Sequence, residues 1–238
     1  LFARHLDDTT AYATVTARSA RLAHDRHDYA QAITQGIAAA NLMHGIAGHD
    51  TLTVVEALSY VSSAQLALGD YAQARATTQR CRDALLALDN PYATATAIGL
   101  AHLDYLAGDA TALDRLRRAV ADFDAAFRAR SGQPPPTAMS GRFDLADDLI
   151  ASGATASLPL ARELSASLDL ASYQRDTGER DWPARFAALR GRLALLDGDK
   201  ARARALLEPA VAAMLAANSP RPQIERAQRA LAAARAAR

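Results

Sequence analysis

Five short turns recur at nearly even intervals along the 238 residues, and this periodicity constrains the fold more than any other feature. Successive turns are 42, 39, 45 and 45 residues apart, and they begin at His27, Gly69, Gly108, Gly153 and Gly198. Internal repeats of 20–50 residues are typical of stacked supersecondary units, each of which cannot bury its apolar face alone. We therefore expect an array of about five similar units.

The turns have a chemistry that joins two helices. Glycine can close a helix in the left-handed conformation without a steric penalty. An aspartate after it can cap the next helix, because its carboxylate accepts a backbone N–H. So short a link produces an antiparallel helical hairpin. This pattern stands at Gly69-Asp70, Gly108-Asp109 and Gly198-Asp199, with His27-Asp28 as a variant.

Apolar residues flank the turns at helical spacing, for example Leu58 and Val61 before Gly69, and Ala74 and Cys81 after it. The chain contains 59 alanines, and alanine is the best helix former. The sequence predicts an all-α fold of five hairpins and a closing helix. The expected pairs are 9–26 with 29–47, 51–68 with 71–88, 91–107 with 109–129, 140–151 with 157–174, and 182–197 with 199–217, followed by a capping helix over 221–236.

We expect a single array over residues 1–238, with a division into 1–130 (three hairpins) and 137–238 (two hairpins and the capping helix). Between these parts the segment 131–136 contains three consecutive prolines, which cannot continue a helix. A second polar loop is expected at 176–181.

The segment from Ala57 to Leu85 resembles a tetratricopeptide repeat (TPR). The resemblance rests on Leu58, Val61, the small Ser62, Leu68-Gly69-Asp70-Tyr71, Ala74 and Cys81, on Gly191, Gly198-Asp199, Ala203 and Ala210, and on Ala20, Asp28-Tyr29, Ala32 and Ala39. It implies a right-handed superhelical stack of antiparallel hairpins, a TPR-like α-solenoid. The units are longer than the usual 34 residues, and Leu113 stands where a small alanine is expected.

Units of about 40 residues resemble the TPR arrays of bacterial signalling proteins, where they act as sensor or regulatory segments. The stretch 205–227 also resembles the C-terminal tail of some bacterial serine/threonine kinases. These resemblances imply a protein–protein or peptide-binding scaffold, the regulatory region of a larger, kinase-linked protein. Two alternatives stay open: a self-assembling structural module, and an enzyme with an unrecognised site on a helical scaffold.

Composition argues against several other classes. The formal net charge of +1 provides no field to recruit nucleic acid. The sequence contains no 18-residue apolar run, so we expect no membrane insertion. Lys200 is the only lysine beside many arginines, which we interpret as a GC-rich, bacterial coding sequence. The cytoplasm fits best, with the periplasm as the alternative if a membrane span lies upstream; the oligomeric state is left open.

No motif for catalysis, phosphate binding or metal binding is found in the sequence. Cys81 is the only cysteine, and the six histidines lack a carboxylate at metal-ligand spacing. We therefore expect no catalytic residue, no cofactor and no metal. The adjacent pair Asp147-Asp148 is interpreted as helix-start or surface charge.

In a TPR-like array the first helix of each hairpin lines the concave side, which implies a partner-binding groove there. Alignment on the turns places one set of residues at a common groove-facing position: Arg21, Ser63, His102, Asp147 and Arg192. The position one turn later holds His24, Leu66, Tyr105, Ile150 and Leu195. From these two sets we predict a groove for an extended peptide or a partner helix, with Arg21, His24, Ser63, His102, Tyr105, Asp147 and Arg192 as the candidate contacts.

Overall fold

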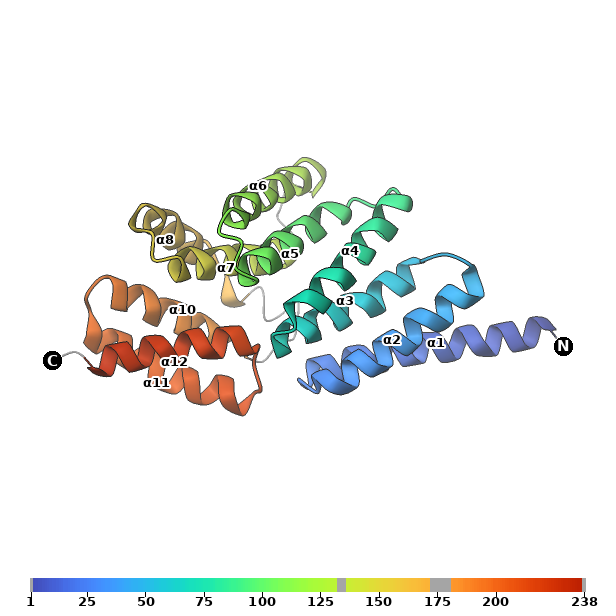
Figure 1. Cartoon of the computed structure of the whole chain (residues 1–238), viewed down its shortest axis with the longest axis horizontal. Coiled ribbons are helices and arrows are strands. Elements are labelled where there is room, and N and C mark those ends of the chain that lie inside the picture. The colour runs from blue at the N-terminus through green and yellow to red at the C-terminus, as the bar shows by residue number, and fades with distance from the viewer. Residues whose placement is uncertain (1, 132–135, 172–180, 237–238) are drawn as a thin grey trace. The chain divides into compact units, whose positions relative to one another are not determined.

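The computed structural model describes residues 2–131, 136–171 and 181–236, and every regular element in these ranges is a helix (Figure 1). None of these helices is long and apolar enough to cross a membrane. The all-α prediction is confirmed. The elements are α1 (Phe2–Asp25), α2 (Tyr29–Ala47), α3 (Leu52–Leu68), α4 (Tyr71–Ala87), α5 (Ala93–Leu106), α6 (Ala112–Ser131), α7 (Pro136–Ala151), the short 3₁₀ helix η1 (Thr155–Ser157), α8 (Leu158–Ala166), α10 (Trp182–Leu196), α11 (Lys200–Ala216) and α12 (Arg221–Ala236).

The chain divides into two compact units, Leu1–Gly108 and Asp109–Arg238. In unit 1, helices α1 to α5 each pack on the next along the chain, and α1 also packs on α3. In unit 2, α6 packs on α7, α7 on α8, α10 on α11 and α11 on α12, while α10 also contacts α7, α8 and α12. The helices of the predicted third hairpin therefore fall in different units, α5 in the first and α6 in the second.

The predicted turns are present, and three of them share one backbone geometry. His27, Gly69 and Gly198 adopt the left-handed conformation with φ of 60°, 83° and 81°. The aspartate that follows each has φ near −84° and ψ near 73°, and its carboxylate caps the next helix through the N–H three residues on. Its own N–H donates to a carbonyl five residues earlier, at 2.8–2.9 Å. Local chemistry alone therefore reverses the chain.

The turn at Asp109 is built differently. Its carboxylate accepts hydrogen bonds from the Thr111 N–H (2.9 Å) and hydroxyl (2.6 Å), and it pairs with Arg115. These contacts, with the Thr111 bonds first, lower the pKa of Asp109 to about 2.

Two predicted boundaries need correction. The helix expected over 157–174 ends at Ala166, after the 3₁₀ turn η1. The segment 131–136 is not wholly outside the helices, because Ser131 ends α6 and Pro136 begins α7; proline is tolerated there because the first N–H groups of a helix lack partners anyway. Residues 132–135, and the polar loop predicted at 176–181 apart from Asp181, lie outside the described residues.

Small residues allow the helices to approach closely. The small residues that carry the TPR resemblance on second helices and on α1 are buried, namely Ala20, Ala32, Ala39, Ala74, Ala203 and Ala210. Two glycines show how little room remains. A Cβ on Gly36 of α2 would lie 2.4 Å from Val61 Cγ2 of α3, and one on Gly191 of α10 would lie 2.7 Å from Leu207 Cγ of α11. The alanine-rich composition is thus a packing requirement as well as a helix preference.

Candidate partner-binding surface

The seven predicted contact residues all lie on first helices, namely α1, α3, α5, α7 and α10. The structure gives them different environments. Arg21, His24, Ser63 and Tyr105 retain exposed surface, whereas His102, Asp147 and Arg192 are buried. The residues at equivalent positions along the chain therefore do not form one uniform surface.

In unit 1, His24 connects the first helices of neighbouring hairpins. Its Nε2 lies 2.7 Å from the Ser63 hydroxyl oxygen, so a hydrogen bond joins α1 to α3. The His24 ring also lies 5.6 Å from the Tyr60 ring, between centroids. Burial raises the pKa of Tyr60 above its ordinary value. Arg21 lies about one turn before His24 on α1 and is exposed. Its Nε atom lies 3.7 Å from the Oδ2 atom of Asp25.

In unit 2, Asp147 and Arg192 belong to a buried ionic cluster. The Arg192 guanidinium pairs with the Asp147 carboxylate, and Arg226 of α12 pairs with both Asp147 and Asp148. Every side chain in this cluster is less than 10% exposed. The interpretation of Asp147-Asp148 as surface charge is therefore wrong.

The cluster contains two arginines and two aspartates, so its formal charges cancel. Burial lowers the pKa of Arg192, although the attraction of Asp147 opposes this effect. Burial also acts to lower the pKa of Arg226, but the two aspartates outweigh it and raise that pKa. Such a cluster fixes how α7, α10 and α12 meet, because a mispaired arrangement would leave a buried charge without its partner.

Sequence reasoning missed Arg226. One signal was available: Asp147 and Asp148 interrupt the short apolar run from Leu145 to Ile150, and a buried carboxylate needs a cation. What the sequence could not supply was which arginine meets them, since Arg226 follows 78–79 residues later.

Beside the ionic cluster, unit 2 has a recess of about 230 Å³. Ile150 and Leu195, the aligned residues one turn beyond Asp147 and Arg192, contribute to its apolar wall. Arg229 is exposed and has no ion-pair partner among the described residues. The lining consists of Ile150, Ala151, Arg192, Leu195, Leu196, Arg226, Arg229 and Ala230. An apolar floor beside an available cation suits a side chain or peptide terminus that is partly apolar and partly acidic.

The described residues contain no group of three or more His, Cys, Asp or Glu side chains placed to hold a metal ion. The Nδ1 atom of His44 lies 2.8 Å from the Oδ1 atom of Asp50, and the Asp50 carboxylate also accepts a hydrogen bond from Arg80. Cys81 is buried, and burial raises the pKa of its thiol to about 12. Its thiolate is therefore scarce near neutral pH.

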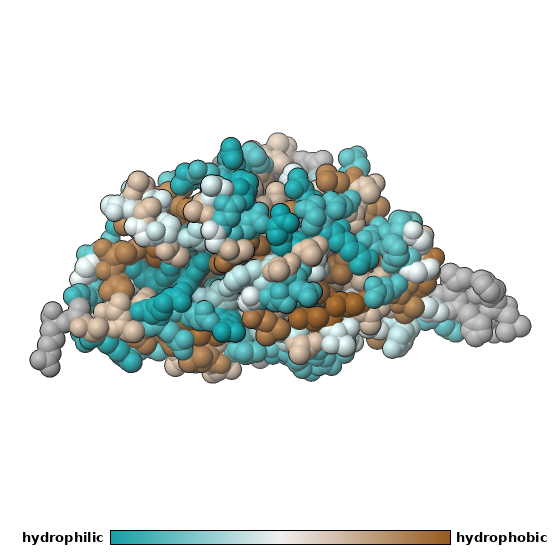
Figure 2. All heavy atoms as spheres, in the orientation of Figure 1, coloured by the Kyte–Doolittle hydropathy of each residue, from teal (hydrophilic) through white to brown (hydrophobic). Residues whose placement is uncertain are grey.

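Over the face drawn in Figure 2, hydrophilic residues are interspersed with smaller hydrophobic patches.

No protein-family model and no curated protein matches the chain. Solved structures do match. One is a crystal structure of a variant of a candidate kinesin light chain from Podospora anserina, described as having nearly identical TPR-like repeats. The similarity covers 86% of this chain and 95% of that one, with a TM-score of 0.54 and 16% sequence identity. At this sequence identity, the similarity is evidence for a shared fold and for nothing further. The chain is thus an all-helical array with the fold of TPR-like repeat proteins.

Proposed function

We propose that the chain is a protein- or peptide-binding scaffold that contacts its partner through the exposed surface of the first helices and of the capping helix α12. The recess of unit 2 carries this proposal, because it combines an apolar floor with the available cation Arg229 and borders the aligned residues Ile150 and Leu195. In unit 1, the contacts assigned are Arg21, His24, Ser63 and Tyr105.

Exposure divides the seven predicted residues into two roles. Arg21, His24, Ser63 and Tyr105 have surface with which a partner can make contact. His102, Asp147 and Arg192 are buried, so they support the surface from beneath. An extended segment with one apolar and one acidic side chain fits the recess, since the apolar group can displace water from Leu195 while the acid meets Arg229.

The finer role that we propose is that of a regulatory region in a larger, kinase-linked bacterial signalling protein. Two resemblances support this role: that of the units of about 40 residues to the TPR arrays of bacterial signalling proteins, and that of residues 205–227 to kinase tails. The coding sequence around the segment tests it: a kinase or another signalling domain in the same reading frame is expected, and an unrelated neighbour contradicts it.

The scaffold proposal is tested by selecting ligands from a random peptide library and locating them by photo-cross-linking. A photoreactive amino acid is placed at Arg229 or Arg21, and as matched controls at Arg204 on α11 or Ala76 on α4, which are exposed second-helix positions. We expect cross-links from positions 229 or 21 and none from the controls. Selected peptides should contain an acidic residue beside an apolar one. Cross-links confined to the control positions, or a library that yields no binder, would refute the proposal.

One observation favours the second candidate, self-assembly. Tyr12, Val15 and Leu22 lie three and seven residues apart on α1 and are 67%, 60% and 50% exposed, forming an apolar stripe on one helix face. If this stripe pairs copies of the chain, the mass measured by light scattering rises with concentration. Val15→Asp should then abolish the rise, while Leu86→Asp on α4, at a similarly exposed apolar residue, should not. A constant monomer mass excludes this candidate.

A further inference from the structure

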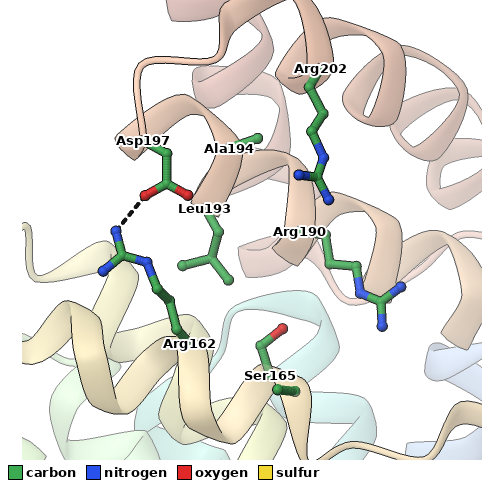
Figure 3. Close-up of a pocket in the computed structure, with 8 residues that line it drawn as sticks. Arg162, Ser165, Arg190, Leu193, Ala194, Asp197 and Arg202 are labelled. Atoms are coloured by element: carbon green, nitrogen blue, oxygen red, sulfur yellow. Dashed lines mark hydrogen bonds and ion pairs between the residues drawn. The ribbon is translucent and has the colours of Figure 1, made fainter.

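A second pocket in unit 2 lies between α8, α10 and α11, on a different side of α10 from the recess. Arg190 belongs to this pocket and Arg192 to the recess, and residues two apart on a helix point roughly 200° apart. The pocket has a volume of about 270 Å³. Figure 3 shows its lining, which consists of Arg162, Ser165, Ala166, Arg190, Leu193, Ala194, Asp197 and Arg202.

The pocket carries an excess of positive charge. Its lining contains three arginines and one carboxylate, that of Asp197, which pairs with Arg162. The guanidinium carbon of Arg190 lies 5.2 Å from the centre of the Phe186 ring, a contact that leaves the N–H groups at its edge able to donate. Neither Arg190 nor Arg202 has a carboxylate partner among the described residues. The local excess is therefore two positive charges.

A serine hydroxyl completes the donor set. Ser165 is 95% buried, and within the described part of the chain its side chain makes no hydrogen bond. By contrast, the Ser167 hydroxyl, two residues further along, donates to the Leu164 carbonyl of its own helix. In Figure 3 the Ser165 hydroxyl points from α8 into the pocket, while the Arg202 guanidinium extends over the pocket from α11. The Ser165 Oγ faces the open pocket, so a ligand there can accept its hydrogen bond.

We propose that this pocket binds the phosphate group of a small organic phosphate monoester. A phosphate dianion matches the two excess charges, and guanidinium groups match phosphate oxygens in geometry. The Ser165 hydroxyl donates a hydrogen bond to the phosphate from below. Leu193, Ala194 and Ala166 provide an apolar wall for the organic part of the ligand. The volume, near the lower limit of ligand pockets, restricts that part to a small body.

The ligand would also join elements far apart in the chain. Ser165 and Arg162 come from α8, Arg190 from α10 and Arg202 from α11. Occupancy of the pocket therefore stabilises the packing of α8 on the α10–α11 hairpin, and the melting temperature of the full chain should rise with ligand concentration.

Isothermal titration calorimetry of the full chain with phenyl phosphate, at pH 7.5 and low ionic strength, tests the proposal. Low ionic strength is needed because dissolved salt screens the attraction between exposed arginines and the phosphate. We expect saturable binding that is tighter than that of inorganic phosphate, which lacks the apolar part, and of benzoate, which has one charge. Arg202→Gln and Arg190→Gln should each weaken phenyl phosphate binding at least tenfold, and Ser165→Ala severalfold. Arg204→Gln, on the same helix as Arg202 but outside the pocket, should leave it unchanged.

A gain-of-affinity variant separates this site from a nonspecific cationic surface. Asp197→Asn removes the carboxylate that competes for Arg162, so phenyl phosphate should bind more tightly than to the wild type. Far-UV circular dichroism verifies that each variant is folded. The proposal is overturned by an absence of phenyl phosphate binding, or by an equal loss in Arg204→Gln. Benzoate binding as tight as that of phenyl phosphate would overturn the assignment of the ligand as a phosphate. Inorganic phosphate binding as tight as that of phenyl phosphate would overturn the claim that the apolar wall binds an organic group.

Discussion

Among the glycines described in unit 1, Gly36 leaves the least room for a side chain. A Cβ at this position would meet Val61 Cγ2 at 2.4 Å and the Ala57 carbonyl oxygen at 3.1 Å, and a backbone oxygen cannot rotate away. We predict that Gly36→Ala lowers the free energy of unfolding by about 1–3 kcal/mol, a typical cost of overpacking. Urea denaturation measures the change.

Gly45 provides the matched control on the same helix. A Cβ there would have nothing within 4 Å, and the residue is exposed. Gly45→Ala should therefore stabilise α2 slightly, by about 0.5–1 kcal/mol, because alanine loses less backbone entropy in a helix. Equal effects at positions 36 and 45 would show that helix propensity, and not the close approach of α2 to α3, determines the result.

Asp50, between α2 and α3, gives a prediction about pH. Arg80 of α4 donates two hydrogen bonds of 2.8 Å to its carboxylate and, against the opposing effect of burial, lowers the pKa of Asp50 to about 2, with His44 adding to the decrease. The unfolded value is about 3.9. A lowered pKa means that this stabilisation is complete above about pH 4 and is lost as the pH falls towards 2.

We therefore predict that Asp50→Asn destabilises the chain by about 1 kcal/mol at pH 7, a charged hydrogen bond reduced by the solvent exposure of Arg80. The difference from the wild type should shrink between pH 4 and pH 2. Urea unfolding of both proteins at pH 7, 4 and 2.5 measures it. A difference that is constant over this range would mean that the ionised carboxylate is not the stabilising form.

At the scale of helices, the ionic cluster decides how α7, α10 and α12 pack. We predict that Arg226→Met lowers the free energy of unfolding by about 3–5 kcal/mol, because Asp147 and Asp148 lose the cation that they share. Arg221→Met on the same helix removes an exposed pair with Glu225 and should cost less than about 1 kcal/mol. Chemical denaturation of the two variants compares them, and similar losses would contradict a structural role for the cluster.

The same helices show what can be derived from sequence. The turns at Asp28, Asp70 and Asp199 were predictable because their chemistry lies within about six residues, and the helix bounds followed from them. The candidate surface was predictable only as a set of equivalent positions. Whether such a position is exposed like Arg21 or buried like Arg192 depends on a partner residue far along the chain. The two aspartates leave a local pattern in the sequence, but the arginines that meet them do not, so the pairing in the ionic cluster and the recess beside it emerge only from the structure.

At the scale of the whole molecule, the division at Gly108 predicts that the two units differ in their response to mutation. Trp182, the only tryptophan, is buried in unit 2 against Phe143 and the Arg185 guanidinium, so its fluorescence reports on that unit. We predict that Gly36→Ala lowers the urea midpoint seen by circular dichroism but leaves the Trp182 midpoint within error. Arg226→Met should lower the Trp182 midpoint. Coincident shifts of both signals in both variants would show that the 238 residues unfold as one unit.

The shared turn geometry also bears on how the protein is made. Each reversal at His27, Gly69 or Gly198 is closed by hydrogen bonds between residues at most five apart, and the helices that it joins are neighbours in sequence. Contacts of such short range cost little loop entropy, and chains dominated by them fold quickly. A hairpin of this kind can form as soon as it leaves the ribosome, before the residues that complete the ionic cluster have been synthesised. Biogenesis would then proceed from the N-terminus, with Arg226 supplying the last of the buried charges.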